Sequence, residues 1–321
     1  MNPPLTLADV RAAGERIAPH LAPTPLRRSH AVPGCDAWLK LECWQPTGSF
    51  KVRGATNIMA SLSPAEAARG VVAASAGNHA LGVAFAAQAL GGRVAATLFV
   101  PTSAPRTKLA KLRSFPVAVH ETGANYDEAH AAALEHAERH ASTYVHAFDD
   151  PRTAAGQGTV GLELLEQLPD VGAVLVPVGG GGLIASIAVA VKALAPQVRI
   201  VGVQPEASPS LRESLALGRP LLQYPAAPTL ADGIAGGIGE IVFELRHLID
   251  DVVVVSEAEI EQAIVALLAH DQVVAEGSAA VGVAALLAGR YRPPTGRPVA
   301  VIVSGANIDA SELARLLQSR A

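Results

Sequence analysis

This sequence contains few cysteines and few lysines, and its net charge is small. The 321 residues contain two cysteines, Cys35 and Cys43, which form no CxxC pair and give no disulfide framework, so a reducing compartment fits. The net charge of −4 offers no basic surface for nucleic acid or an acidic membrane. No apolar run reaches the roughly 18 residues of a membrane span, and residues 1–21 contain no signal-peptide core. We therefore expect a soluble cytoplasmic protein.

Apolar residues make up half of the sequence and charged residues 17%, which is typical of a compact globular protein. Short β-branched runs alternate with Ala/Leu-rich helical patterns almost from end to end. This alternation predicts an α/β fold with parallel sheets covered on both faces, and ligands at the carboxyl ends of the strands. The predicted strands are 70–75, 93–100, 117–121, 143–148, 173–178, 199–204, 251–255 and 298–304, and the predicted helices include 78–90, 125–140, 183–195 and 257–269.

One lysine stands out because lysine is otherwise rare. Five of the 25 basic residues are lysines, so the protein usually places a fixed positive charge with arginine. Lys51 lies in the stretch "PTGSFKVRGA" (46–55). A desolvated lysine can lose its proton and act as a nucleophile, whereas arginine cannot. Schiff-base chemistry is therefore one interpretation of Lys51, and a partly exposed lysine after a strand is the other.

Three strand-to-helix turns carry polar or glycine-rich sequences. In "VPVGGGGLIASIAVAV" (176–191) four glycines precede an apolar helix, an arrangement that suits a phosphate or a flexible connection. The turn in "ASAGNHALGVA" (74–84) can hold a carboxylate or a phenolic oxygen, or merely cap its helix. The stretch "VIVSGANID" (301–309) ends a buried strand in Ser304, whose hydroxyl often just satisfies backbone groups. Each signal alone is weak.

Together and in this order, the motifs resemble the fold-type II pyridoxal-phosphate enzymes, in the branch of threonine/serine dehydratases and serine racemases. The resemblance runs from about residue 20 to 310. It implies two open parallel-sheet α/β domains with pyridoxal 5'-phosphate in the cleft between them. The small domain is expected at 70–147, inserted in a large domain formed by 1–69 and 148–321. The matching stretches are "PTGSFKVRGA", "SAGNHALGVA", "DDPRTAAGQGTVGLELLEQ", "PVGGGGLIASIA", "TLADGIAGGIG" and "IVSGANID".

The resemblance also implies a role for individual residues. Lys51 is expected to hold the cofactor through a Schiff base and then to remove the α-proton of the substrate. Asn78 is expected to bind the phenolic oxygen of the cofactor, and Ser304 its pyridine nitrogen. Ser75, Ala76, Gly77, Asn78 and His79 form the expected turn for the substrate carboxylate. The remaining expected cofactor contacts are Phe50, Gly179, Gly180, Gly181, Gly182, Leu183, Gly233 and Glu276.

The expected reaction is the conversion of L-threonine and/or L-serine to a 2-oxo acid and ammonia by β-elimination of water. A serine hydroxyl at Ser304 leaves the pyridine nitrogen largely neutral, which suits reactions that expel a β-substituent quickly. Racemases of the family tend to carry a second serine where this sequence has Ala76, so racemisation is disfavoured. Racemisation of serine or aspartate nevertheless stays open as the alternative activity. Dehydration of hydroxyaspartate, phenylserine or an ectoine-derived amino acid also stays open, as does a non-catalytic nucleotide-binding protein.

No metal site is expected, although many members of the family bind a divalent cation through acidic residues. The corresponding positions hold Gln204, Ser208 and Ser210, with Glu206 shifted, and a hard cation prefers carboxylates. The expected partners are a small amino-acid substrate and further copies of the chain, as a homodimer or homotetramer. Because the sequence ends soon after "SGANID", we expect neither a C-terminal regulatory domain nor control by isoleucine.

Overall fold

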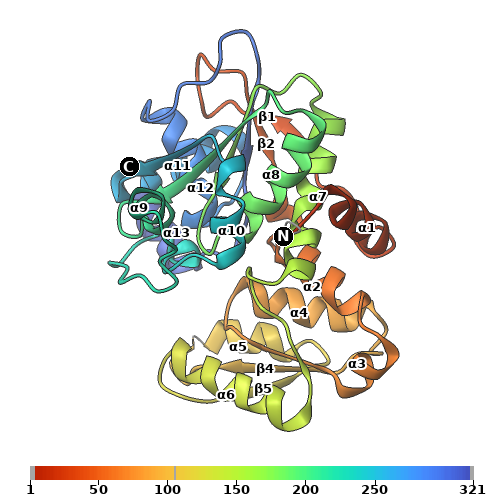
Figure 1. Ribbon diagram of the computed structural model, residues 1–321. Coiled ribbons are helices and arrows are strands. Elements are labelled where there is room, and N and C mark those ends of the chain that lie inside the picture. The colour runs from red at the N-terminus through yellow and green to blue at the C-terminus, as the bar shows by residue number, and fades with distance from the viewer. Residues whose placement is uncertain (1–3, 105, 319–321) are drawn as a thin grey trace.

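The computed structural model describes residues 4–104 and 106–318, which form two sheets, each covered by helices (Figure 1). The larger sheet has six strands in the order β1-β2-β10-β7-β8-β9, and the smaller has four in the order β5-β4-β3-β6. Neighbouring strands are parallel except for β1 and β2. The strands are β1 (Leu26–Arg28), β2 (Ala37–Lys40), β3 (Val71–Ala74), β4 (Ala96–Val100), β5 (Ala118–Glu121), β6 (Thr143–Tyr144), β7 (Ala173–Pro177), β8 (Arg199–Pro205), β9 (Asp251–Val255) and β10 (Val299–Ile302).

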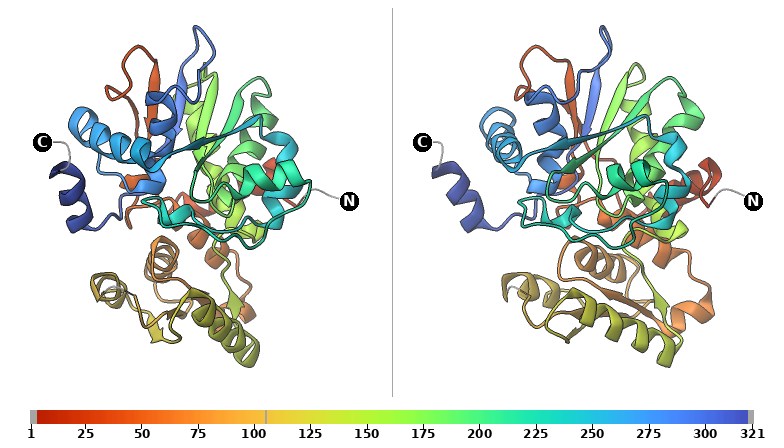
Figure 2. Two further views of the ribbon diagram at one scale, coloured as in Figure 1. Left: turned by 90° about the vertical axis from the view of Figure 1, so that its left-hand side faces the viewer. Right: turned by 60° about the vertical axis from the view of Figure 1, so that its left-hand side comes forward.

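Helices cover both faces of each sheet, and in all three views the small sheet lies below the large one (Figures 1 and 2). The helices are α1 (Leu7–Ile17), α2 (Lys51–Ala60), α3 (Pro64–Arg69), α4 (Asn78–Ala89), α5 (Arg106–Arg113), α6 (Tyr126–His140), α7 (Pro151–Gln167), α8 (Gly182–Leu194), α9 (Ser210–Leu217), α10 (Glu240–Glu244), α11 (Glu257–Asp271), α12 (Gly277–Leu287) and α13 (Ala310–Gln318). Three short 3-10 turns add η1 (Glu42–Trp44), η2 (Asp232–Ile234) and η3 (Arg246–Leu248).

The central strand β7 shows why these strands are apolar without interruption. Val174 and Val176 pack with α1, α7 and α8, whereas Ala173 and Leu175 pack with α11 and α12. In the small sheet, Val71 and Ala73 face the core shared with α4, and Val72 and Ala74 face α6. A strand buried on both faces has no solvent side for polar residues. The predicted α/β class with parallel sheets is confirmed.

Some element boundaries differ from the predicted ones. Helix α11 starts at a capping box formed by Ser256 and Glu259, and it continues to Asp271, two residues beyond the predicted end at 269. The predicted strand 143–148 is a strand only at Thr143–Tyr144. After Val145, whose N–H still donates to the Val72 carbonyl, the chain leaves the small sheet and crosses to the large one. The predicted domain boundaries of 69/70 and 147/148 lie just before β3 and within this crossing segment.

Helix α2 lies between the two sheets and packs against both halves of the molecule (Figure 1). Ala55, Ile58 and Met59 belong to the core of the small sheet. On the opposite side α2 crosses α7 at a pair of glycines. A Cβ on Gly54 would lie 2.4 Å from the Gln157 side chain, and a Cβ on Gly156 would lie 2.6 Å from the Arg53 carbonyl oxygen. The two helices can approach this closely only because neither residue has a side chain.

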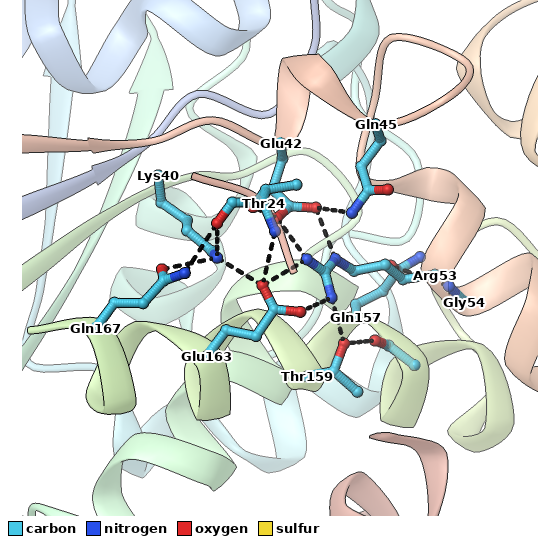
Figure 3. A network of polar contacts seen from close by, with 11 residues as sticks. Thr24, Lys40, Glu42, Gln45, Arg53, Gly54, Gln157, Thr159, Glu163 and Gln167 are labelled. Carbon is cyan, nitrogen blue, oxygen red and sulfur yellow. Dashed lines mark hydrogen bonds and ion pairs between the residues drawn. The ribbon is translucent and has the colours of Figure 1, made fainter. Parts of the chain in front are cut away.

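A buried network of charges, drawn in Figure 3, fixes α2 against β2 and α7. Arg53 is 1% exposed, and all five of its N–H donors are used, by Glu42, Glu163 and Thr159. Lys40, which is fully buried, uses its three donors on Glu163, the Thr24 carbonyl and Gln167. We call Lys40, Glu42, Arg53 and Glu163 the α2 charge network. Every donor of its two cations has a partner, so their burial leaves no N–H group unsatisfied.

No helix within the described residues is long and apolar enough to cross a membrane.

Candidate active site

Lys51 is the first residue of α2, and the turn after β10 holds the start of this helix. Ser49 pairs with Gly305 in a single antiparallel bridge, and the Phe50 N–H donates to the Ser304 carbonyl at 3.1 Å. The Lys51 amine donates to the Ala147 carbonyl at 2.8 Å and lies 5.1 Å from the centre of the Phe50 ring. Lys51, Phe50 and Ser304, which the sequence predicted as site residues, are therefore brought together.

Burial lowers the pKa of Lys51 to about 8, although the nearby carboxylate of Glu276 acts in the opposite direction. The acceptor of the Lys51 amine is the neutral Ala147 carbonyl. With a pKa of about 8, the Lys51 amine is half deprotonated near pH 8 and about one tenth deprotonated at pH 7, far more than an ordinary lysine, and a nucleophile or a base requires the deprotonated form.

The four glycines form a tight connection between β7 and α8. A Cβ on Gly180 would lie 2.3 Å from the Phe148 ring. Gly181 has a φ of +87°, and a Cβ there would lie 2.4 Å from Val242. No side chain caps the first turn of α8, whose N–H groups have no partners within the helix. A loop of this shape can hold a phosphate, because backbone N–H groups and the helix dipole favour an anion there.

The turn between β3 and α4 brings further predicted residues to the same region. The Ser75 hydroxyl accepts from the Gly77 N–H at 3.1 Å, which stabilises the turn. Asn78 begins α4, and its side-chain amide donates to Glu276 at 2.8 Å. Ala76 packs partly against the core of the small sheet. Asn78 on the small-sheet side therefore lies opposite Glu276 on the large-sheet side.

The His79 ring lies on the other side of this turn. The ring is 5% exposed, and its Nε2 lies 2.8 Å from the Val145 carbonyl oxygen. A carbonyl can only accept, so Nε2 carries the proton. Burial, helped by the nearby charges of Lys51 and His146, lowers the pKa of His79 to about 3. The ring is therefore neutral. The predicted contact between His79 and the substrate carboxylate then concerns the backbone N–H of His79, and it stays a prediction.

Three further predicted residues are Gly233, Leu183 and Glu276, and Gly233 lies close to Glu276 whereas Leu183 lies in the core. A Cβ on Gly233 would lie 2.9 Å from the Ser278 hydroxyl and 3.9 Å from Glu276 Oε1. Leu183 is buried in the core beneath the glycine loop. Glu276 itself accepts from the Asn307 N–H as well as from Asn78.

A cavity of about 220 Å³ borders Glu276, Gly277 and Asn307. A second cavity of about 340 Å³, beside α9, is lined by none of the predicted site residues.

Sequence reasoning missed several groups at this site. Phe148 and the Ala147 carbonyl belong to the crossing segment, which carries no motif of its own. Asn307 lies in the quoted stretch "VIVSGANID", but no role was predicted for it. The buried hydroxyls of Thr47, Ser49 and Ser278 have no hydrogen-bond partner within the described residues. Buried hydroxyls normally have partners, so these three groups are available to water or to a bound molecule.

The side-chain amide of Gln204 holds together the segment 204–212, in which no metal ligands were expected. The Gln204 side chain donates to the Val178 and Ser208 carbonyls and to the Ser210 hydroxyl, each at 3.3 Å. Its carbonyl oxygen accepts from the N–H groups of Leu211 and Arg212. Across residues 4–104 and 106–318, no group of three or more His, Cys, Asp or Glu side chains is arranged to hold a metal ion. The absence of a metal stays a prediction.

Comparison with known proteins gives the family. The model of the family described as "Pyridoxal-phosphate dependent enzyme" matches residues 17–305. The chain belongs to this family. L-threonine ammonia-lyase of Thermotoga maritima is 46% identical to this pyridoxal-phosphate enzyme, over 98% of the chain and 78% of the relative. The processed form of threonine deaminase isoform 2 from Solanum lycopersicum superposes with a TM-score of 0.91 at 36% identity, covering 98% and 92% of the two chains. Maize serine racemase superposes with a TM-score of 0.91 at 32% identity, covering 98% and 97%.

The predicted family, type II fold and cofactor are thus confirmed, and the site of this pyridoxal-phosphate enzyme fits that cofactor. The glycine loop leaves backbone N–H groups for a phosphate, and Lys51 presents an amine with a lowered pKa. The unpartnered hydroxyls of Ser49 and Ser278 flank the same region.

Proposed function

We propose that this enzyme converts L-threonine and/or L-serine to a 2-oxo acid and ammonia by eliminating water. The observation that carries the proposal is the Lys51 amine, with a pKa of about 8, at the turn that carries Ser304. The named activities of the Thermotoga and tomato relatives support the same reaction class. Bound pyridoxal phosphate supplies an aldehyde that condenses with amines and a ring that withdraws electrons from the α-carbon of the substrate.

We propose that Lys51 would hold the cofactor covalently and that its free amine would accept the proton from the substrate α-carbon. That proton balances the hydroxide lost from the β-carbon, so the elimination gives one water, and hydrolysis then consumes one water and releases the 2-oxo acid and ammonia. The glycine loop, Gly179–Gly182, would hold the phosphate. Asn78 would donate to the phenolic oxygen, and Ser304 would bind the pyridine nitrogen without protonating it. Phe50, Leu183, Gly233 and Glu276 complete the proposed surroundings of the cofactor.

The substrate carboxylate would be bound by the turn 75–79. Ala76 would present a methyl group there, and a methyl group cannot deliver a proton to the face of the α-carbon opposite Lys51. Inversion of the α-carbon needs acid/base groups on both faces, so this residue favours elimination over racemisation. Wild-type enzyme should release 2-oxo acid from L-serine with little D-serine formed. Ala76→Ser should gain D-serine formation, measured by chiral chromatography, whereas efficient racemisation by wild type would contradict this reading of Ala76.

Lys51→Ala tests the proposal directly. The purified wild type should be yellow, and borohydride should trap a peptide containing Lys51. The variant should fold with an unchanged melting temperature but lose turnover by several orders of magnitude, since carrier and base are lost together. The assay is 2-oxo acid release from L-threonine, L-serine, hydroxyaspartate and phenylserine. Turnover within tenfold of wild type, or release from none of these substrates, would overturn the proposal.

We also propose that the enzyme acts in the cytoplasm as a homodimer or homotetramer with domain boundaries near 69/70 and 147/148. Cys35 and Cys43 are both free thiols, as is usual in a reducing compartment. Light scattering on the eluting protein would measure the assembly, and a monomer at micromolar concentration would contradict it. Limited proteolysis should cut preferentially at the proposed boundaries.

A further inference from the structure

Asn307 connects both sides of the cleft through four hydrogen bonds. Its N–H donates to Glu276 Oε2 at 3.1 Å. Its side-chain Nδ2 donates to the Thr47 carbonyl at 2.9 Å and to Asn78 Oδ1 at 2.7 Å. Its Oδ1 accepts from the Lys111 amine at 2.8 Å. Lys111 and Asn78 lie on α5 and α4, which belong to the small sheet, whereas Asn307 follows β10 of the large sheet.

The chemistry of these partners fixes the direction of both amides. A lysine ammonium can only donate and a backbone carbonyl can only accept. Lys111 therefore requires Oδ1 of Asn307 on its side, and Thr47 requires Nδ2 on the other. Nδ2 of Asn307 then faces Asn78, so Asn78 must present its oxygen to Asn307 and its N–H groups elsewhere. The orientation of an asparagine amide is often ambiguous. Here the series of hydrogen bonds from Lys111 through Asn307 to Asn78 has fixed donors and acceptors at its ends, so only one orientation of each amide fits.

The orientation of Asn78 matters because its Nδ2 has two hydrogens and only one is used by Glu276 among the described residues. The second remains for a ligand in the cleft. Rotation of the Asn78 amide by 180° would turn its oxygen toward the Glu276 carboxylate and toward any anionic oxygen of a ligand. That arrangement places acceptor against acceptor, so the rotated form binds an anionic oxygen poorly.

We propose that Asn307 is a positioning residue that holds the Asn78 amide with its N–H groups toward the cofactor, and that Lys111 fixes Asn307 when the small sheet closes on the large one. This inference rests on the proposed function, in which Asn78 donates to the phenolic oxygen of pyridoxal phosphate. In this proposal Asn307 acts on the cofactor through Asn78, to which its Nδ2 donates. Lys111 links the orientation to closure because it reaches Asn307 from the opposite side of the cleft.

A double-mutant cycle separates this role from a purely structural one. Four proteins are compared: wild type, Asn307→Ala, Asn78→Ala and the double variant. Pyridoxal phosphate is removed and titrated back, and its Kd is read from the visible absorption band, with the melting temperature measured in parallel. Asn307→Ala should weaken cofactor binding about tenfold in the wild-type background, as expected for loss of one orienting contact. In the Asn78→Ala background the same change should alter the Kd less than twofold.

Asn307→Asp and Lys111→Met supply independent tests. Asn307→Asp keeps the shape but replaces the donor by an acceptor, so it should weaken cofactor binding more than Asn307→Ala and shift the visible band. Lys111→Met should weaken binding about threefold and have no effect in the Asn307→Ala background. Lys192→Met is the matched control, because Lys192 pairs with Asp250 at the far edge of the large sheet and should leave the Kd unchanged.

Equal losses in both backgrounds, or an unchanged Kd in Asn307→Ala, would overturn the positioning role. If Asn307→Ala does not fold, the same cycle with Asn307→Asp or Lys111→Met decides the question. Failure of the proposed function has a different signature. In that case wild type releases no 2-oxo acid from any substrate in the panel, whatever the cofactor titrations of the Asn307 variants give.

Discussion

Two polar networks flank helix α2, and they differ in how completely their groups are satisfied. The α2 charge network (Lys40, Glu42, Arg53 and Glu163) uses all eight N–H donors of its two cations (Figure 3). The network across the cleft joins two amides, one carboxylate and one lysine. Within residues 4–104 and 106–318, one Asn78 N–H and several nearby hydroxyls have no partner. The first has no unused donor for a ligand, whereas the second does.

This difference indicates how the enzyme separates stability from chemistry. A saturated buried network holds α2, and with it Lys51, in one position, because any movement would expose or unpair charges. The cleft network consists of partly exposed contacts, which are individually weaker than the buried charge pairs. Lys51 begins the helix between the two networks, so its backbone is fixed while its side chain remains available.

The largest expected effect is on the stability of the α2 charge network. Arg53→Ala leaves the fully buried Glu42 without a cation and should lower the free energy of unfolding by about 3–5 kcal/mol. Asn307→Ala in the cleft should lower it by less than about 1.5 kcal/mol. Urea denaturation followed by circular dichroism measures both.

The double variant Glu42→Met/Arg53→Met is the control for charge balance. It removes one carboxylate and one cation and leaves Lys40 paired with Glu163, so it should recover at least half of the loss. An Arg53→Ala protein as stable as Asn307→Ala would contradict the distinction between the two networks.

Lys51 differs from Lys40 and Arg53, the fully paired cations of the α2 charge network, in how readily it should react as a free amine. Burial lowers the pKa of Lys51 to about 8, against about 10.4 for a free lysine. The reactive free amine therefore increases as pH rises toward 8. The rate at which cofactor-free enzyme recombines with pyridoxal phosphate should rise with a midpoint near pH 8, and at pH 7 it should be about 100-fold faster than the reaction of a free lysine side chain. Stopped-flow absorbance measures both rates, and a midpoint near pH 10 would show that the Lys51 amine is not desolvated.

A smaller effect is expected from the acid titration of Glu42. Burial acts to raise the pKa of Glu42, but the charge and hydrogen bonds of Arg53 outweigh it, so the pKa lies below its usual value. A carboxyl with a depressed pKa stabilises the folded state above its unfolded pKa of about 4.3, and this stabilisation is lost as pH falls through the folded pKa. The melting temperature of wild type should therefore fall more steeply below pH 4 than that of Glu42→Gln. Parallel curves would mean that Glu42 does not titrate differently in the two states.

The smallest expected effect is that of metal removal. Gln204 holds the 204–212 segment through five hydrogen bonds and, unlike a cluster of carboxylates, needs no cation for neutrality. EDTA should change turnover by less than twofold and the melting temperature by less than about 2 °C. A drop of many degrees that Mg²⁺ restores would reveal a cation site that these residues do not explain.

Local patterns carried most of the prediction of the fold and of the cofactor site. Uninterrupted apolar strands alternating with helices predicted parallel sheets. Four successive glycines between a strand and a helix suited a phosphate or a flexible connection, and Lys51 suited Schiff-base chemistry or a partly exposed position. The resemblance of six separate motifs to one family decided between these interpretations. Each of these signals lies within about ten residues of sequence.

The tertiary structure alone decided what those residues face. Lys51 and Ala147 are 96 residues apart, Asn78 and Glu276 are 198 apart, and Asn78 and Asn307 are 229 apart. No local pattern encodes such pairs, since they form only when two sheets built from distant segments pack around α2. The lowered pKa of Lys51 and the fixed direction of the Asn78 amide arise in the same way. Sequence supplied the amine and the amide, whereas desolvation and donor–acceptor direction depend on neighbours that only folding brings near.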